Sequence, residues 1–566
     1  VPRTGFSLPA GSAPNRAPLA TTMRKGRVGN DTAFLFVKLD FWFPAPKIGK
    51  KGERMNGADS LVETLAASGI EVCFANPGTS EMHFVAALDK SPIRPVLALF
   101  EGVATGAADG YGRMTGKPAS TLLHLGPGFA NGIANLHNAR RAATPIVNVV
   151  GDHASWHNRY DAPLMSDIMG ICRPVSHWLY SISSAKTAAI DAARAVAAAR
   201  AVPGQIATLI LPADSAWDEA EQSAAALPVA KPASVSSTAV DRAARALRNG
   251  KRTMLLLRGP ALLREGVRAA GRIATKSGAR VAHDFLPARV TRGAGLPPVE
   301  RIPYFAEDIV ERLKGLEQLI LVGAPPPVTF FAYPDKPSWV TPEGCEIITL
   351  SHPYEDGTQA MNAVADAIGA PKDGATAQLE RPPMPHGELT AMTMGQIIAR
   401  LLPENAILSE EAATTGAGLT KFLPCSAPHD ILYLTGGSIG QALPVATGAA
   451  IGAPDRKVVT VSGDGGAMYT LQALWTQARE RLDVVTVICA NRAYAILNVE
   501  LTRVGANNAG PKALSMLDIG HPDLDWVALA RGMGVEAERA RDCTEFARAF
   551  EDAVKSKGPR LIEAIL

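Results

Sequence analysis

The chain has 566 residues, too many for one hydrophobic core, so about three domains of ordinary size are expected. Its 47% hydrophobic residues, 51 glycines and 42 prolines indicate a globular α/β protein and exclude a disordered one. The net charge of +3 gives no support for a nucleic-acid partner, and no apolar run is long enough to span a membrane. Six scattered cysteines without paired spacing are typical of reduced thiols in a cytoplasmic protein.

Residues 1–54 differ from the rest of the chain in charge and pattern. They carry a local charge of +7, whereas residues 55–566 carry −4. They are rich in Pro, Gly and Ala and show no periodicity, so we expect them to lie outside the fold, disordered or not native. Two origins fit this composition: a basic, acid-poor transit peptide, or residues upstream of a physiological start at Met55.

From Met55 onward, apolar strand patterns alternate with helical patterns. Helices are predicted at 57–68, 81–88 and 102–114, and strands at 71–75, 95–100, 119–124 and 145–151. This rhythm specifies a doubly wound parallel sheet. Two linkers, at 221–238 and 370–388, contain proline and small residues and separate further units of the same kind.

The expected fold is therefore three doubly wound α/β domains with parallel sheets. We place them at residues 55–222, 238–370 and 388–566. The middle domain is Rossmann-like but lacks a Gly-x-Gly-x-x-Gly fingerprint, which argues against a nicotinamide oxidoreductase.

The most informative stretch is Gly463-Asp464-Gly465, followed 27 positions after its aspartate by Asn491. A β-branched run leads into the glycines, a helical pattern follows, and a second apolar run at 484–490 ends at Asn491. Such a crossover makes the two strands parallel and places both polar residues at carboxyl ends, where α/β sheets bind ligands. Oxygen donors beside glycines suit Mg²⁺ held against a diphosphate. The alternative is that Asp464 caps a helix and Asn491 begins a turn.

This motif resembles the cofactor motif of thiamine-diphosphate (ThDP) enzymes. The resemblance implies that Asp464, Asn491 and the backbone carbonyl of Ala493 bind Mg²⁺, whereas Arg492 departs from the Asn-Gly pair usual in the family. It also implies that the following residues contact the cofactor: Asn76, Pro77, Gly78, Ala412, Ala413, Gly437, Ser438, Ile439, Gly463, Gly465, Gly466, Tyr494 and Ala495.

Two of these groups have a physical reason to lie near phosphate. The glycines at 436, 437 and 440 allow close backbone approach and open a predicted helix, whose start attracts anions. The turn at 409–414 follows a short strand at 406–408, and the resemblance implies that its backbone faces the diphosphate. Ile439 corresponds to the bulky apolar residue beneath the cofactor, although plain core packing would equally explain it.

Glu101 directly follows an apolar strand, in FEGVATGAADGYGRMTGKP. This segment resembles the family's pattern in which a catalytic glutamate hydrogen-bonds the aminopyrimidine ring. A carboxylate that only complements a helix dipole is the alternative. His124 and Thr79 resemble the proton-transferring residues of benzoylformate decarboxylases, and a histidine satisfied by backbone at a strand end is the alternative for His124.

The resemblance implies a ThDP- and Mg²⁺-dependent decarboxylase or carboligase of small 2-oxo acids such as pyruvate, similar to the acetolactate synthase large subunit. The alternatives are a benzoylformate-type aryl 2-oxo acid decarboxylase and a non-catalytic ThDP-binding homologue. Relatives share active sites between subunits, so a homodimer or homotetramer is expected. The family's middle domain can bind FAD, but no residue here supports it.

Overall fold

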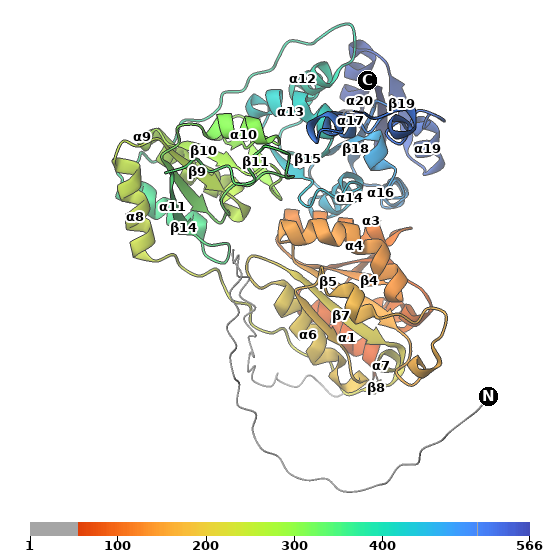
Figure 1. The fold of residues 1–566 in the computed structure, drawn as a ribbon. Coiled ribbons are helices and arrows are strands. Elements are labelled where there is room, and N and C mark those ends of the chain that lie inside the picture. The colour runs from red at the N-terminus through yellow and green to blue at the C-terminus, as the bar shows by residue number, and fades with distance from the viewer. Residues whose placement is uncertain (1–54, 507) are drawn as a thin grey trace, which may run out of the picture. The chain divides into compact units, whose positions relative to one another are not determined.

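The computed structural model describes residues 55–506 and 508–566, so the predictions made for residues 1–54 lie outside the described residues. Helices flank three larger sheets, whose strands are all parallel except one (Figure 1). The predicted class, α/β with doubly wound parallel sheets, is confirmed. No helix within the described ranges combines the length and the apolar character needed to cross a membrane.

The first sheet has six parallel strands in the order β3-β2-β4-β5-β7-β6. Its strands are β2 (Val72–Asn76), β3 (Arg94–Leu97), β4 (Ala119–Leu123), β5 (Ile146–Asp152), β6 (Trp178–Ser181) and β7 (Ile206–Pro212). The helices that matter for the site are α1 (Gly57–Ala67), α2 (Met82–Leu88), α3 (Glu101–Thr115) and α4 (Leu125–Ala142). Two apolar cores cover the two faces, which explains why the strands read as continuous hydrophobic runs.

The second sheet has five parallel strands in the order β12-β10-β9-β13-β14. They are β9 (Thr253–Leu257), β10 (Arg280–His283), β12 (Glu300–Arg301), β13 (Gln318–Val322) and β14 (Glu346–Ser351). The helices of this unit are α8 (Ser237–Arg248), α9 (Arg264–Ser277), α10 (Ala306–Leu313) and α11 (Gly357–Ala367).

The third sheet has seven strands in the order β11-β16-β15-β17-β18-β20-β19. They are β11 (Val290–Arg292), β15 (Ala406–Glu411), β16 (His429–Tyr433), β17 (Val458–Gly463), β18 (Val484–Ala490), β19 (Glu536–Ala540) and β20 (Arg560–Ile565). Its helices include α12 (Ala391–Leu401), α14 (Ala442–Gly452), α15 (Asp464–Ala467), α16 (Ala473–Arg479), α17 (Ala495–Arg503), α18 (Pro511–Ser515), α19 (Trp526–Gly532) and α20 (Cys543–Lys555).

Strand β11 is a feature that the sequence did not predict. It lies in the segment assigned to the central domain, yet it pairs antiparallel with β16 at the edge of the third sheet. The Thr291 hydroxyl on β11 donates a hydrogen bond of 2.5 Å to Asp430 on β16, which fixes this pairing. The proposed domain boundaries remain predictions, and one strand of the segment 238–370 belongs to the sheet of the segment 388–566.

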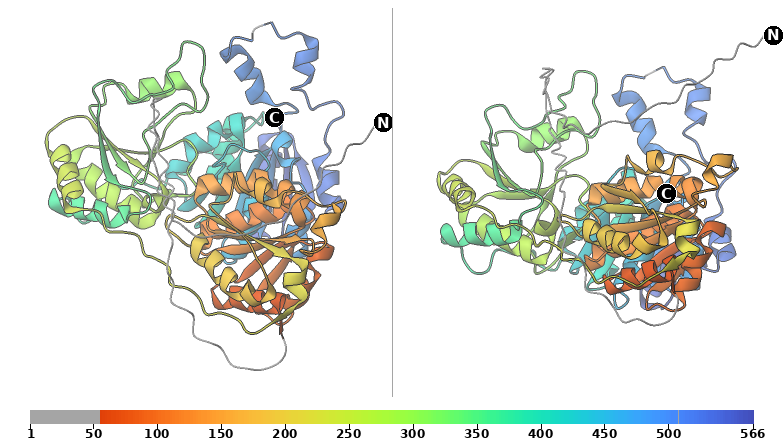
Figure 2. Two further views of the ribbon diagram at one scale, coloured as in Figure 1. Left: turned by 60° about the horizontal axis from the view of Figure 1, so that its bottom comes forward. Right: turned by 90° about the horizontal axis from the view of Figure 1, so that it is seen from below.

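The helix expected after Asp464 is interrupted. It forms the short α15, then successive tight turns, and resumes as α16. The Thr470 hydroxyl in the interruption donates to the carbonyl of Gly440 at 2.8 Å. A side chain that bonds another loop in this way competes with regular helix geometry. Helices α17 and α18 contain no buried residue and stand away from the third sheet (Figure 2).

Candidate active site

The edge predicted for Mg²⁺ is formed by two neighbouring strands. β17 and β18 pair in parallel with Gly463 opposite Cys489, so Asp464 and Asn491 follow the carboxyl ends of adjacent strands. Asp464 lies so close to the second strand's loop that its Oδ2 accepts a 2.8 Å hydrogen bond from the backbone N–H of Arg492. The strand–helix–strand arrangement that the sequence predicted is confirmed.

The Asp464 carboxylate is suited to a cation. It is 4% exposed, and burial raises its pKa above the ordinary value. Among the described residues no basic side chain forms a salt bridge with it, and none of their hydrogen bonds uses the Ala493 carbonyl. A buried charge without a counterion is costly, and a bound metal removes that cost.

No group of three His, Cys, Asp or Glu side chains in the described ranges is arranged to hold a metal. The expected magnesium set does not need one, because it has a single carboxylate, an amide oxygen and a backbone carbonyl. The Asn491 Oδ1 accepts a 3.1 Å bond from the Ala493 N–H, which holds the amide and this loop together. The donor chemistry of the three residues therefore fits Mg²⁺ bound with a diphosphate.

The backbone is strained just after three strands that precede predicted site residues. Leu125, Ala413 and Arg492 have φ values of 49°, 46° and 57°, in the left-handed region that favours glycine. Leu125 follows β4 of the first sheet, and Ala413 and Arg492 follow β15 and β18 of the third. Strain of this kind concentrates at functional sites.

Glu411, the last residue of β15, occupies the helix start that was predicted to bind phosphate. Its buried carboxylate accepts hydrogen bonds from the N–H groups of Gly440, Gln441 and Ala442, at 2.6, 2.7 and 2.7 Å. The start of α14 therefore holds the chain's own carboxylate, so the expectation that this helix start attracts phosphate is wrong. Burial raises the pKa of Glu411 to about 7 against these three donors.

Strand β15 also runs to Glu411 and does not stop at residue 408, because it pairs with β16 and β17 along its length. Ala412, buried, donates its N–H to the Glu410 side chain at 2.9 Å, and Ala413 follows in the left-handed conformation. The turn predicted to face the diphosphate is thus held by side chains from the strand before it.

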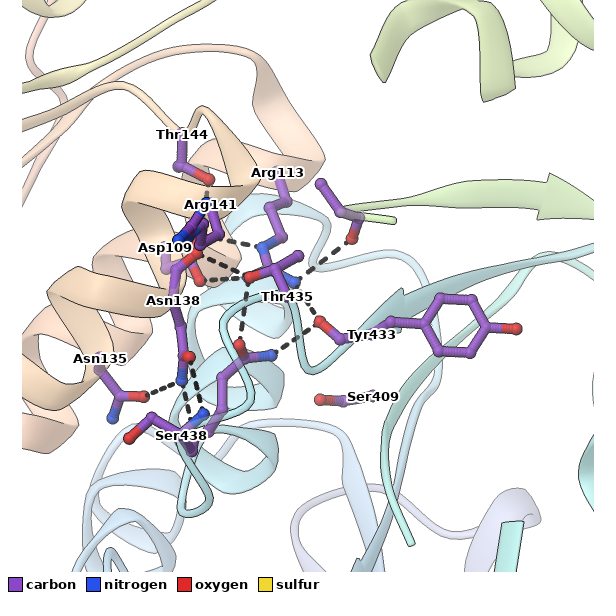
Figure 3. Close-up of polar contacts among 12 residues, drawn as sticks. Asp109, Arg113, Asn135, Asn138, Arg141, Thr144, Ser409, Tyr433, Thr435 and Ser438 are labelled. Atoms are coloured by element: carbon purple, nitrogen blue, oxygen red, sulfur yellow. Dashed lines mark hydrogen bonds and ion pairs between the residues drawn. The ribbon is translucent and has the colours of Figure 1, made fainter. Parts of the chain in front are cut away.

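The loop of residues 436–440 before α14, called the glycine loop below, is hydrogen-bonded to α4 beside the first sheet. Asn138 on α4 donates to the Ser438 carbonyl at 2.8 Å and accepts from the Ser438 N–H at 3.2 Å (Figure 3). Ile439 is half-buried and belongs to none of the hydrophobic cores, which does not support the core-packing alternative. Gly437 has a φ of 76°, and a Cβ there would lie 2.9 Å from the Phe330 ring.

Tyr494, a predicted cofactor contact, packs against the loop that carries Asp464. A Cβ on Gly465 would lie 2.5 Å from the Tyr494 ring, so this glycine is needed for the close approach. A Cβ on Gly463 would meet no atom within 4 Å, which leaves open space beside the Asp464 loop. Gly466 lies against Glu411, and Ala495 begins α17 directly after Tyr494.

Glu101 is the first residue of α3 and is only 6% exposed. Its Oε2 accepts a 3.0 Å hydrogen bond from Asn131 on α4. Asn135, one turn further along α4, donates to the Gly102 carbonyl at 2.8 Å and to the Gly440 carbonyl at 3.4 Å. The start of α3 and the glycine loop before α14 therefore lie side by side within one chain.

His124 follows β4 directly and lies near Glu101. A Cβ on Gly128 would lie 3.0 Å from the Glu101 Oε1 and 3.3 Å from the His124 Cβ, so both side chains border this glycine. The His124 Nδ1 lies 2.7 Å from the Oε2 of Glu81. Asn76 ends β2, Pro77 and Gly78 form the loop, and Thr79 is exposed at the start of the short helix that ends at Glu81.

Sequence reasoning assigned no role to Glu81, Glu411 or Phe330. Glu81 and Glu411 were each part of a segment that was noted, but their side chains find partners 43 and 29 or more residues away. Phe330 belongs to a loop of the central unit without any motif, so no sequence signal could have connected it with Gly437.

Comparison with known proteins identifies the family. Residues 55–171 match the description "Thiamine pyrophosphate enzyme, N-terminal TPP binding domain", and residues 414–564 match "Thiamine pyrophosphate enzyme, C-terminal TPP binding domain". The chain is 49% identical over 514 residues to "Putative acetolactate synthase large subunit IlvX" of Mycobacterium tuberculosis, covering 90% of this chain and 99% of that protein. It is 27% identical over 531 residues to benzoylformate decarboxylase of Pseudomonas aeruginosa, covering 88% and 97%.

A solved structure has the same fold. The ThDP-dependent 4-hydroxybenzoylformate decarboxylase of Rhodococcus jostii RHA1 matches with a TM-score of 0.78 at 23% identity, covering 90% of this chain and 98% of that one. The chain therefore belongs to the ThDP-dependent enzymes. Within them it is an enzyme of the acetolactate synthase and benzoylformate decarboxylase type.

Proposed function

We propose that the protein is a ThDP- and Mg²⁺-dependent decarboxylase or carboligase of 2-oxo acids, similar to acetolactate synthase, and that pyruvate is a substrate. The observation that carries the proposal is Glu101, a buried carboxylate at the start of α3, in the same chain as an intact Asp464–Asn491 edge. A homologue that only bound the cofactor would need the edge but not Glu101. This argues against the non-catalytic alternative.

Each predicted residue has a separate task in this proposal. Asp464, Asn491 and the Ala493 carbonyl would hold Mg²⁺, and the cofactor, once bound, would supply the electron sink for loss of carbon dioxide. Glu101 would hold or release a proton at the bound cofactor's aminopyrimidine, and Asn131 keeps the Glu101 carboxylate in place. Ile439 offers an apolar side chain outside the cores.

A second candidate is the benzoylformate-type decarboxylase, which releases an aldehyde. The pairing of His124 with Glu81 favours it, because release of an aldehyde requires a proton donor at the reacting carbon. A carboligase, by contrast, transfers the acyl unit to a second carbonyl and does not need that protonation.

The remaining parts of the proposal concern assembly and location. We propose a homodimer or homotetramer in which the partner subunit completes the active site, located in the cytoplasm. All six cysteines are free thiols, which is compatible with a reducing compartment. Light scattering at several protein concentrations tests the assembly: a monomer with full activity would contradict shared sites.

The experiment that tests the function reconstitutes the protein with ThDP and Mg²⁺ and offers pyruvate and benzoylformate separately. Acetolactate from pyruvate supports the leading candidate, and benzaldehyde from benzoylformate supports the second. Omitting ThDP, or replacing Mg²⁺ by a chelator, should abolish either product. Binding of ThDP without turnover of any 2-oxo acid in a panel would contradict both.

A further inference from the structure

Glu81 is a buried carboxylate to which the proposed reaction assigns no catalytic task. It ends the short helix Thr79–Glu81 and is 1% exposed. Its Oε2 accepts a 2.7 Å hydrogen bond from the Gly78 N–H and lies 2.7 Å from the His124 Nδ1. One carboxylate oxygen thus joins the Asn76–Glu81 loop to the strand end that carries His124.

Two glycines make room for this pair. A Cβ on Gly151, at the end of β5, would lie 1.7 Å from the Glu81 Oε1, and a Cβ on Gly78 would lie 2.3 Å from the His124 Nδ1. The Glu81 Oε1 is buried and finds no hydrogen-bond donor among the described residues. A buried carboxylate oxygen without a donor is unfavourable, so its stabilising partners are the Gly78 N–H and the imidazole.

The electrostatics of the pair favour one arrangement of protons. Burial raises the pKa of Glu81, whereas the hydrogen bond and the charge of His124 act against that rise. His124 is the one titratable side chain of the described residues that acts on Glu81 in this way. A carboxylate beside Nδ1 selects the tautomer protonated at Nδ1 and leaves Nε2, on the far side of the ring, free to exchange a proton.

We propose that Glu81 is the positioning residue for His124: its carboxylate holds the Nδ1–H and so makes Nε2 the atom that delivers a proton in the reaction. This inference rests on the proposed function. In that step the Nε2–H bond of the imidazolium breaks, and a C–H bond forms with the electron pair left by loss of carbon dioxide. The imidazole remains with its proton on Nδ1, and Nε2 regains one from water, to which the His124 side chain is 24% exposed.

The pair also explains why the loop and the strand end are organised together. Glu101 and His124 border the same glycine, Gly128, from two different elements. The hydrogen bond to Glu81 and the close approach of Gly78 to the Nδ1 side of the ring restrain rotation of the imidazole. The role of Glu81 is therefore orientation and tautomer selection, and the atom that meets the substrate belongs to His124.

The test compares Glu81→Gln with Glu81→Leu. The glutamine oxygen can still accept from the Gly78 N–H and from the Nδ1–H, whereas leucine removes the acceptor. We expect ¹⁵N NMR of histidine-labelled protein without cofactor to show His124 protonated at Nδ1 in the wild type and in Glu81→Gln, and to show loss of that preference in Glu81→Leu, with His124→Gln for assignment.

Kinetics give the second readout. With a 2-oxo acid that is turned over, Glu81→Leu should lower kcat by about tenfold to a hundredfold with little change in KM, and Glu81→Gln should lower kcat less. Glu63→Gln, an exposed carboxylate on α1, should change neither.

A wild-type His124 protonated at Nε2, or a tautomer and a kcat in Glu81→Leu equal to those of the wild type, would overturn the inference. The failures are distinguishable. If no 2-oxo acid is turned over, the proposed function fails, while the NMR measurement still decides whether Glu81 sets the tautomer of His124.

Discussion

At the residue scale, the candidate site contains backbone conformations that non-glycine residues seldom adopt. Arg492 directly follows Asn491 and has a φ of 57°, in the left-handed region. Its N–H is the donor to the Asp464 Oδ2, so the unusual conformation directly supports the predicted metal ligand. The Arg492 side chain forms a half-exposed ion pair of 3.0 Å with Asp523, which contributes little stability.

Replacement of Arg492 therefore separates backbone strain from side-chain contacts. Arg492→Gly should exceed Arg492→Ala in free energy of unfolding by about 1 kcal/mol, because glycine reaches the left-handed region without a Cβ clash. Both variants lose the ion pair with Asp523, so their difference isolates the backbone. Urea unfolding of the two proteins measures it, and equal stabilities would show that the loop is not strained.

The buried side chain of His429 should make the free energy of unfolding depend on pH. It is 1% exposed at the start of β16, among Arg292, Asp430 and Arg456, and burial lowers its pKa from 6.5 to about 4. The unfolded chain binds the proton first, so stability should fall as the pH drops below about 6.5 toward the folded-state pKa. At pH 5 this one residue contributes a loss of about 2 kcal/mol relative to neutral pH.

The measurement compares unfolding free energies at pH 7.5 and 5.0 in wild type and in His429→Gln. The variant should lose about 2 kcal/mol less between the two conditions. His386→Gln, which replaces an exposed histidine, is the matched control and should keep the wild-type dependence. An identical pH dependence in His429→Gln would mean that the residue is accessible to protons in the folded state.

At the element scale, α3 and α14 cross closely, and each helix begins beside predicted site residues. Small residues allow it: a Cβ on Gly110 would lie 2.0 Å from the Val445 carbonyl oxygen, and a Cβ on Gly448 would lie 1.8 Å from the Ala107 carbonyl oxygen. Glu101 begins α3, and Glu411 binds the first amides of α14. The separation of the helices therefore sets the separation of Glu101 from the glycine loop.

Gly110→Ala tests this crossing. The new methyl group meets backbone, which cannot rotate away, so we expect a loss of about 1–3 kcal/mol in unfolding free energy. The control is Gly532→Ala at the end of α19, where a Cβ meets nothing within 4 Å. There alanine should be neutral or stabilise by up to about 1 kcal/mol. A neutral Gly110→Ala would contradict the close packing.

At the scale of the whole described chain, one buried arginine connects the first unit with the third sheet. Arg113 on α3 pairs with Asp109 at 2.5 Å, donates to the Tyr433 carbonyl at 2.7 Å and reaches the Thr435 hydroxyl at 2.9 Å (Figure 3). Among the described residues Arg113 forms its salt bridge with Asp109, whose other oxygen also accepts from Thr144 at 2.6 Å. The network thus joins α3, the end of α4 and the loop that leads to the glycines.

Arg113→Met should lower the unfolding free energy by about 3–5 kcal/mol, because it leaves the Asp109 carboxylate buried without its partner. The matched substitution Arg548→Met removes an exposed ion pair on α20 and should cost less than about 1 kcal/mol. Calorimetry should also show a broader or divided unfolding transition in Arg113→Met, because the first domain and the third sheet would be less strongly coupled. Equal effects of the two substitutions would contradict a joining role for Arg113.

The sequence predicts the parts of the fold in which long apolar strand patterns alternate with helical periodicity. Asp464 and Asn491 could be placed together because strand ends are readable and parallel neighbours bring their carboxyl ends to one edge. Strand β11 could not, since three residues carry no period and its partner lies about 140 residues away. The Glu81–His124 contact and the carboxylate at α14 depend on the packing of separate elements, which local pattern does not encode.

The central claim is that Glu101 and the Asp464 edge serve one ThDP-dependent reaction. The most direct measurement is carbon dioxide release from 2-oxo acids by wild type and Glu101→Gln, together with calorimetric binding of ThDP and Mg²⁺. We predict that Glu101→Gln still binds the cofactor but releases carbon dioxide at least about a hundredfold more slowly. Full turnover by Glu101→Gln, with the cofactor bound, would contradict the account.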